Sequence, residues 1–432
     1  MRRLFLYEFV TGGGWYSVDP TVAPPVSLLR EGRAMLQALA SDLAAMPETH
    51  VVVLQDSRLP NLDVENCPVH TVRSSDEEQQ LIRQMSSKAD GTILIAPEFE
   101  RLLLQRARWV EEAGGRLLSP SSEVIDLCGD KQRTEEHLAA AGVCVPEGFL
   151  AALNGNNEGE VHNEIPGISF PFPIVLKRND GAGSQGTRLL KSHAEFESVW
   201  NELRRNLQRA GTNVALCSET GRPFAERKTT MIEGTIASNT TLEPHEWRIE
   251  RFCPGVATSV AVLCGPKGNQ PLLPCTQELS TDGNFQYLGG ECPLPSDLAQ
   301  RATRLAMDAV ATLPSPVGYV GVDLVLGDNP NGTADVVIEI NPRLTTSYVG
   351  LRQVAKTNLA AAMLEIASGD RFSTSFSLEF SGQTVQFTSA GGVHVSLCGG
   401  FEGWAADERA AGAGAKIFVQ ASIFTEAGRA KL

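Results

Sequence analysis

The sequence lacks the patterns that mark several common classes of protein. Its nine cysteines are scattered singly, with no C-x-x-C pair and no closely spaced Cys/His group. Neither a zinc site nor a disulfide framework is therefore indicated, and a reduced, cytoplasmic location is expected. No stretch approaches the ~18 apolar residues of a membrane-spanning helix. The apolar run at residues 1–10 is broken by Glu8 and is too short for a signal peptide, and no internal repeat is found.

Positive charge is also scarce. The 432 residues carry a formal net charge of −14, which argues against a sequence-independent nucleic-acid partner and against binding to an anionic membrane. A single basic pocket for phosphates is still compatible with this balance. The hydrophobic content of 42% excludes a disordered chain, and the length predicts about three domains.

The first part of the chain alternates between strand and helix patterns. In residues 1–118, short apolar strands are separated by helical stretches, which predicts a small α/β domain with a parallel sheet. The turn TGGGWYS after the first strand falls short of a dinucleotide fingerprint, because Ser17 stands where a glycine is needed, so no nicotinamide cofactor is expected. Glu8 and the glycines at 12–14 follow that strand, where open α/β sheets place ligands. A substrate role and a purely structural turn both stay open.

Two late strands carry acids that would be costly to bury without a partner. The segment VVIEINPRLTTSYVG begins as an apolar, β-branched run, yet it carries Glu339 and Asn341. These two side chains share one face of a strand because they are two residues apart. The preceding apolar segment, GYVGVDLVLGD, carries Asp323. If the two segments form a hairpin centred near Asn331, Asp323 and Glu339 become cross-strand neighbours.

This hairpin predicts a metal site. Two carboxylates and an amide oxygen, from Asp323, Glu339 and Asn341, suit a hard cation such as Mg²⁺, which keeps its other positions for water and phosphate oxygens. Arg343 lies just beyond them, where a guanidinium would neutralise phosphate charge. The alternative is a hairpin whose acids simply face water.

Two further segments have features of a phosphate site. Lys131 lies in the first turn of a helix capped by Asp130, where a cation opposes the helix dipole unless a phosphate is nearby. An ordinary surface lysine is the alternative. In FPIVLKRNDGAGSQGTRLL, an apolar strand delivers Lys177, and a glycine-rich loop leads into the next strand.

Because glycines let backbone N–H groups approach an anion closely, we expect this loop to lie over the phosphates of a nucleotide. The residues expected to contact the phosphates are Gly181, Gly183, Ser184 and Gly186. The loop is not a Walker loop, because Gly186 is followed by Thr-Arg and the chain continues as a strand. A plain β-hairpin turn is the alternative.

Residues 247–263 predict a strand, a bend and a second strand. Glu250 at the bend could accept a hydrogen bond from the exocyclic amine of an adenine, while the backbone at Cys253 meets the ring edge. A surface glutamate on an edge strand is the alternative.

Taken in order, these residues resemble the ATP-grasp superfamily of carboxylate–amine ligases. The resemblance implies that Lys131 and Lys177 contact the ATP phosphates, that residues 181–186 form the glycine-rich lid and that residues 250–255 form the adenine hinge. It also implies roles for four later residues: magnesium binding by Asp323, Glu339 and Asn341, and stabilisation of the acyl-phosphate step by Arg343. One position departs from the pattern, because Ala257 stands where many relatives place an acid that binds the ribose.

More narrowly, the segments LFLYEFVTGGG, YLGGECPLP and VVIEINPRLTTSYVGL are similar to the tyramine–glutamate ligase branch, which makes the glutamyl-tyramine unit of methanofuran. This similarity implies that ATP phosphorylates a substrate carboxylate and that an amine then attacks the acyl phosphate, with glutamate and tyramine or tyrosine as substrates. It implies ATP and two Mg²⁺ ions, with Mn²⁺ as an alternative metal. The expected partners are small-molecule carboxylates and amines, without nucleic acid or membrane, and a homodimer is the assembly considered.

The resemblance also implies an overall α/β organisation. A pre-ATP-grasp domain at 1–118 is followed by a two-lobed ATP-grasp core of the α+β type at 119–370, whose lid lobe spans about 145–252. A β-rich extension at 371–432 has no assigned chemistry. Two other functions stay open: a ligase of different amino-acid specificity, and a nucleotide-binding protein without turnover, which the missing ribose acid at Ala257 suggests.

Overall fold

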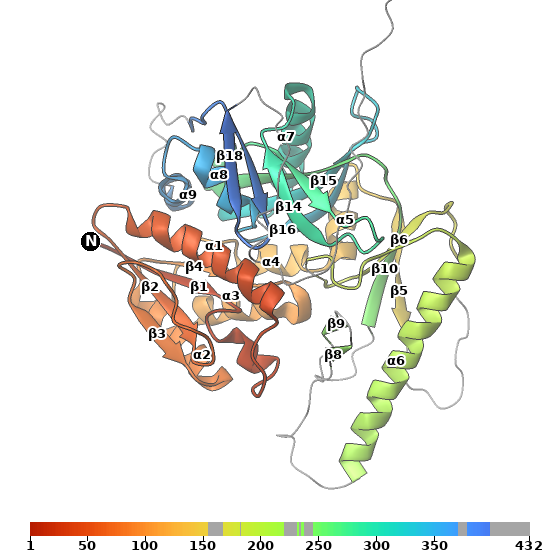
Figure 1. The fold of residues 1–432 in the computed structure, drawn as a ribbon, viewed down its shortest axis with the longest axis horizontal. Helices are drawn as coiled ribbons and strands as arrows, with labels where there is room; N and C mark the ends of the chain where they lie inside the picture. Colours follow the sequence, from red (N-terminus) through yellow and green to blue (C-terminus); the bar gives the residue numbers. More distant parts are fainter. Residues whose placement is uncertain are drawn as a thin grey trace, which may run out of the picture. The chain divides into compact units, whose positions relative to one another are not determined.

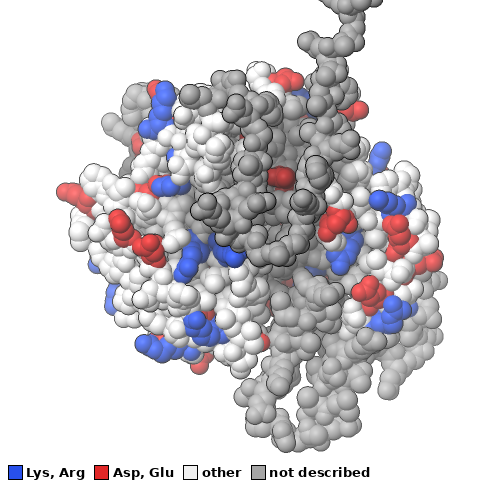
Figure 2. All heavy atoms as spheres, in the orientation of Figure 1, with Lys and Arg blue, Asp and Glu red and all other residues white. Residues whose placement is uncertain are grey.

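The computed structural model describes residues 1–153, 167–181, 183–219, 231–232, 235–236, 245–369 and 378–397. Figure 1 shows the arrangement of the elements. Among the described residues, none of the helices combines the length and apolar character needed to cross a bilayer. On the face drawn in Figure 2, acidic and basic side chains are interspersed over the described surface.

The N-terminal segment forms the parallel sheet that the sequence predicts. Its four strands, in the spatial order β3-β2-β1-β4, all pair in parallel. The strands are β1 (Arg2–Glu8), β2 (Thr49–Asp56), β3 (Val69–Val72) and β4 (Gly91–Ile95). The accompanying helices are the 3₁₀ turn η1 (Gly14–Ser17), α1 (Val26–Ala44), α2 (Ser75–Lys88), the 3₁₀ turn η2 (Phe99–Arg101) and α3 (Leu102–Glu112). The regular alternation of strand and helix requires crossover connections, and these give a parallel sheet.

A large sheet of antiparallel strands forms the centre of the molecule, in the order β16-β15-β11-β13-β14-β17-β18, with β12 paired to β11. Its strands are β11 (Val256–Gly265), β12 (Gly268–Pro271), β13 (Cys275–Leu279), β14 (Tyr287–Cys292), β15 (Gly318–Leu326), β16 (Val336–Asn341), β17 (Gln383–Thr388) and β18 (Val393–Leu397). Alternate residues of β11 enter different cores. Val260 and Val262 pack in one cluster with helix α7 (Ser296–Ala311), and Ala261 and Leu263 pack in another with α8 (Ser347–Val354) and α9 (Leu359–Ser368).

Strands β17 and β18 lie in the segment that we predicted to be a β-rich extension. They are strands, but they continue the central sheet, because β17 pairs with β14 from Gly289↔Thr388 to Cys292↔Val385. Val385 and Phe387 are buried in the same core as α8 and α9. The described residues 378–397 thus belong structurally to the central sheet. Residues 398–432 lie outside the described part.

The N-terminal segment and the central sheet share one hydrophobic core. Leu36, Leu39 and Leu43 of α1 are fully buried in the cluster that also contains Leu351 of α8 and Met363 of α9. Helix α1 therefore packs against both parts of the molecule, and this packing brings the N-terminal segment to the edge of the site described below.

A smaller sheet carries the glycine-rich loop. Its strand order is β5-β10-β6-β7, with β5 (Gly148–Leu153), β6 (Ile174–Arg178), β7 (Arg188–Leu190) and β10 (His245–Arg251). Helix α6 (His193–Glu219) covers it, because Phe196 and Trp200 pack on Leu176 and Ile249. The remaining elements are α4 (Ser122–Cys128), α5 (Lys131–Ala140) and the short pair β8 (Met231–Ile232) and β9 (Thr235–Ile236). Residues 252–255 connect β10 of this sheet to β11 of the central sheet.

Candidate active site

The acidic hairpin forms as the residue spacing predicts. Strands β15 and β16 are antiparallel, and Asp323 lies directly opposite Glu339. A register shift follows immediately, between Asp323 and Leu324, and such irregularities are common beside active sites. The amide of Asn341 donates a 3.0 Å hydrogen bond to Asp323, and Gln277 of β13 donates another of 2.9 Å.

The environment of Asp323 and Glu339 disfavours a negative charge on both carboxylates. Burial, and then the nearby Glu339 carboxylate, raise the pKa of Asp323 to about 7. A divalent cation would reverse both effects, and two carboxylates with an amide oxygen are the donors that Mg²⁺ prefers. The donor set of Asp323, Glu339 and Asn341 therefore fits this metal. No group of three or more His, Cys, Asp or Glu side chains suited to a metal occurs among the described residues.

Lys131 joins the hairpin to the glycine-rich loop. Its ammonium group donates to Glu339 at 2.5 Å and to the carbonyl of Gly181 at 2.7 Å. The helix begins where the sequence predicts, because Asp130 caps α5 by accepting from the N–H of Arg133. Lys131 is 8% exposed, so it is a buried lysine and the surface alternative is wrong.

The glycine-rich loop connects the antiparallel strands β6 and β7, as predicted. Gly183, Ser184 and Gly186 have φ values of 61°, 62° and 74°, a conformation that glycine adopts without strain and other residues rarely adopt. Ala182 lies outside the described residues. These three positive φ values give the loop a tight path over the cavity described below.

Lys177 lies in a buried cluster of four charges. Its ammonium contacts Glu250 at 2.8 Å and Glu135 at 3.3 Å, and Arg248 forms ion pairs with both acids. Burial alone would lower the pKa of Lys177, but Glu250 and Glu135 outweigh it and raise the pKa. Glu250 is therefore a buried, paired carboxylate and not a surface residue. Its predicted contact with an adenine stays a prediction.

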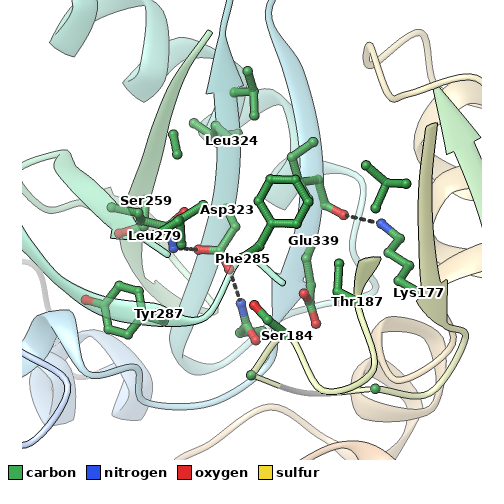
Figure 3. Close-up of a pocket in the computed structure, with 18 of the residues that line it drawn as sticks. Lys177, Ser184, Thr187, Ser259, Leu279, Phe285, Tyr287, Asp323, Leu324 and Glu339 are labelled. Atoms are coloured by element: carbon green, nitrogen blue, oxygen red, sulfur yellow. Dashed lines mark hydrogen bonds between the residues drawn. The ribbon is translucent and has the colours of Figure 1, made fainter. Parts of the chain in front are cut away.

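A cavity of about 220 Å³ brings these groups together. It is lined by eleven of the twelve predicted site residues, namely Lys131, Lys177, Gly181, Gly183, Ser184, Glu250, Cys253, Asp323, Glu339, Asn341 and Arg343. Gly186 does not line it, although its neighbours Gln185 and Thr187 do. Figure 3 shows four of these residues around the cavity. Lys177 and Ser184 come from the smaller sheet and its loop, and Asp323 and Glu339 come from the central sheet. Residues of the acidic hairpin and of the glycine loop thus line one cavity, and their predicted contacts with a nucleotide stay predictions.

Arg343 is fixed by a residue from the N-terminal segment. Its guanidinium donates to both carboxylate oxygens of Glu98, at 2.8 and 3.1 Å. Burial alone would lower the pKa of Arg343, but the Glu98 carboxylate raises it. Glu98 precedes two residues with positive φ, Glu100 and Arg101, and the N–H of Glu100 donates to Asp180 of the glycine loop at 3.1 Å.

Several residues of the site could not be found from the sequence. Gln277 and Glu98 lie in segments without any recognisable motif, and Glu135 and Arg248 look like ordinary surface residues of a helix and a strand. Each becomes part of the site only through packing between distant segments. Spacing in the sequence gives no signal for such contacts.

Glu8 lies in a hydrogen-bonded turn. Its buried carboxylate accepts hydrogen bonds from the N–H groups of Val10 and Thr11 and from the Thr11 hydroxyl. Burial raises the pKa of Glu8. Glu8 and the glycines at 12–14 do not line this cavity, and the N–H of Gly12 donates to the carbonyl of Glu8, which closes a turn at the end of β1.

Comparison with known proteins finds two domain matches and a relative that is similar over most of its length. A family model described as an ATP-grasp domain matches residues 228–347, and one described as a pre ATP-grasp 3 domain matches residues 49–125. The chain is 22% identical to a tyramine–L-glutamate ligase from Methanocaldococcus jannaschii, over 88% of this chain and 93% of that protein.

Solved structures share the fold. An ATP-grasp superfamily protein from Archaeoglobus fulgidus matches with a TM-score of 0.57 and 19% identity, covering 90% of this chain and 92% of that one. An N5-carboxyaminoimidazole ribonucleotide synthetase in complex with ADP matches with a TM-score of 0.57 and 16% identity, covering 90% and 81%. The two domain matches and the similarity along most of the sequence relate this chain to ATP-grasp ligases, and the solved structures show that it has the ATP-grasp fold.

Proposed function

We propose that this protein joins glutamate to tyramine or tyrosine, as part of the biosynthesis of methanofuran or an analogue. The chain is an ADP-forming, amide-forming ligase of the ATP-grasp superfamily. The finer assignment of substrates is supported by the similarity to tyramine–L-glutamate ligases, which extends over most of both chains. The structural observation that carries the proposal is the single cavity on which the glycine loop, two lysines and the acidic hairpin converge.

In this proposal the lysines and the loop hold the nucleotide. Lys131, Lys177 and the backbone N–H groups at 181–186 bind the phosphates, and the backbone near Cys253 meets the adenine. Asp323, Glu339 and Asn341 would hold Mg²⁺, which would supply positive charge to offset that of the phosphates. Two ions are expected, with Mn²⁺ as an alternative metal.

The reaction then has two steps. A carboxylate oxygen of the acid substrate attacks the terminal phosphorus of ATP, the bond to ADP breaks and an acyl phosphate forms. The uncharged amine attacks its carbonyl carbon, phosphate leaves with the bonding electrons, and the nitrogen loses a proton to give the amide. Arg343 stabilises negative charge on the transferring phosphoryl group. No side-chain nucleophile is required.

The contacts seen in the structure must change when nucleotide binds. Lys131 is paired with Glu339, and Lys177 is paired with Glu250 and Glu135. Phosphate oxygens compete for both ammonium groups, and a cation competes for Glu339. Binding of ATP together with Mg²⁺ therefore exchanges protein ion pairs for ligand contacts, which keeps the desolvated charges compensated throughout.

An ADP-release assay tests the proposal. Purified protein is incubated with ATP, Mg²⁺, glutamate and a panel of amines, and the amide product is identified by mass spectrometry. We expect release of ADP that depends on both glutamate and tyramine or tyrosine. Glu339→Ala should lower the rate by roughly 100-fold or more, because a cation ligand is lost. Glu278→Ala is the matched control, since Glu278 is an exposed acid on β13 that does not line the cavity.

The alternatives give different results in the same assay. Turnover with other amino acids, but none with glutamate and tyramine or tyrosine, would assign a ligase of another specificity. Binding of ATP without substrate-dependent turnover across the whole panel would favour a nucleotide-binding protein. The observation behind this second alternative is Ala257, which lines the cavity without a group that could bind the ribose hydroxyls.

A further inference from the structure

Helix α1 contributes one charged side chain to the cavity. Glu31 lines it, although most of the inward face of α1 is apolar and packs in the shared core. The carboxylate accepts a 2.8 Å hydrogen bond from the hydroxyl of Thr346, which is itself 5% exposed. Glu31 is thus fixed against the segment that follows Arg343. No chemistry described so far uses this carboxylate.

The acids of the cavity differ in their partners. Among the described residues, four carboxylates line it, those of Glu31, Glu250, Asp323 and Glu339. Glu250 and Glu339 form ion pairs with cationic side chains, and Asp323 belongs to the candidate metal site. Within the described part of the chain, Glu31 forms no ion pair. A carboxylate that faces a cavity without a cationic partner is available to a positively charged ligand.

The Glu31 carboxylate acts electrostatically on two other residues that line the cavity, Arg343 and Tyr287. Burial has the largest influence on both groups, lowering the pKa of Arg343 and raising that of Tyr287. The negative charge of Glu31 has a smaller influence and raises both pKa values. Arg343 is itself occupied by Glu98. Tyr287 also lines the cavity, and its hydroxyl has no hydrogen-bond partner among the described residues. Gln277 and Thr345–Ser347, which also line the cavity, are uncharged.

We propose that Glu31 binds a primary ammonium group of a substrate, with the Tyr287 hydroxyl as a second polar contact. The inference rests on the proposed function, because both proposed substrates carry such a group. It goes beyond that function by naming the residue that selects a charged substrate. A charge-assisted hydrogen bond between a carboxylate and an ammonium group is about twice as strong as a neutral one, so the contact discriminates against uncharged analogues.

Two substrates could supply the ammonium group, and they are distinguishable. If it is the α-ammonium of glutamate, the wild-type enzyme should prefer glutamate to glutarate, which lacks only that group, and Glu31→Gln should lose the preference. If it is the ammonium of the amine, Glu31→Gln should raise the KM for the amine and leave the KM for glutamate unchanged. In either case the KM for ATP should stay the same, because Glu31 does not contact the lysines.

The experiment measures ADP release by wild type, Glu31→Gln and Arg30→Gln, with each substrate varied in turn. We expect Glu31→Gln to raise one substrate KM by about 10- to 100-fold, the range for losing a hydrogen bond between charged groups. Arg30→Gln is the matched control, because Arg30 is exposed, precedes Glu31 on the same helix and lines a different groove. It should behave like wild type.

The outcomes separate this inference from the proposed function. If wild type shows no turnover with any amine, the proposed function fails. If wild type turns over and Glu31→Gln has unchanged KM values for both substrates, the role of Glu31 is refuted. A drop in kcat with all three KM values unchanged also refutes it. Binding of ATP to Glu31→Gln, measured by calorimetry, shows whether that variant is folded.

Discussion

Two clusters of buried charge in this protein are built differently. In the N-terminal segment, Arg106 and Glu78 are both fully buried and joined by two hydrogen bonds of 3.0 Å. Tyr7 donates to the same carboxylate, and Ser17 accepts from the guanidinium. In the active-site cavity, Lys131, Glu339 and Asp323 also lie close together, but their ion pair faces a cavity.

The difference separates a structural cluster from a functional one. The cluster around Arg106 is closed, because each charged group has its partners within the protein. The cluster around Asp323 is incomplete, since burial and a second carboxylate raise its pKa to about 7. Burial of charge therefore does not itself indicate a site. A buried charge that the protein leaves without full compensation does.

The largest effect is expected from a substitution that breaks the closed cluster around Arg106. Arg106→Leu leaves the Glu78 carboxylate buried without its cation, and such a loss costs about 3–5 kcal/mol of stability. Denaturant unfolding measures it. At a temperature where the variant remains folded, its ADP release per folded molecule should equal that of wild type, because the cluster does not line the cavity. A variant of normal stability would show that the pair is not required for folding.

A smaller effect is expected at Glu98, which joins the N-terminal segment to the active-site cavity. Glu98→Gln removes the carboxylate that fixes Arg343, so Arg343 should adopt other positions. We expect kcat to fall about 10- to 100-fold, because small displacements of a catalytic group carry costs of that order. The KM for ATP should change little, and stability should fall less than in Arg106→Leu, because Arg343 lines the cavity and its side chain is 13% exposed. If Glu98→Gln instead lost as much stability as Arg106→Leu and kept a normal kcat, the role of Glu98 would be structural.

The smallest effect concerns pH and the cluster around Lys177. Burial raises the pKa of Glu135 to about 7 in spite of the nearby Lys177. Between the ordinary carboxyl pKa and about 7, the folded protein then binds more protons at this site than the unfolded chain does. Stability should therefore fall as the pH rises through that window, and the contribution should be constant above it.

Melting curves of wild type and Glu135→Gln between pH 4.5 and 8 measure this contribution. The difference in stability between the two proteins should shift in favour of the variant as the pH approaches 7. A difference that does not vary with pH would mean that Glu135 keeps its charge throughout, as a fully compensated carboxylate does.

The parts of the site that the sequence predicts are those set by local spacing. Asp323 and Glu339 are equidistant from the turn at Asn331, so hairpin geometry alone places them opposite each other. The glycine loop and Lys177 are likewise neighbours in the sequence. The sequence could not predict the roles of Glu98, Gln277 and Glu31. Their contacts depend on the docking of segments that lie 46 to 315 residues apart. The ion pair between Lys131 and Glu339 could not be predicted for the same reason.

The fold was predictable to a similar extent. Alternation of strands and helices indicates the parallel sheet at 1–118, and the resemblance implies the two-lobed core. The attachment of β17 to β14 was not predicted, because pairing between residues 93 to 99 positions apart leaves no local pattern in either strand. The proposed domain boundaries at 118 and 370 remain predictions.

The shared core around α1 limits how this enzyme can be rearranged. One helix supplies leucines to the packing beneath α8 and α9 and also supplies Glu31 to the cavity. The first 118 residues are therefore not an exchangeable module. A chimera that takes them from a relative must bring matching α8 and α9 surfaces as well. A fragment that begins after them would expose core residues of α8 and α9, such as Leu351 and Met363, to water.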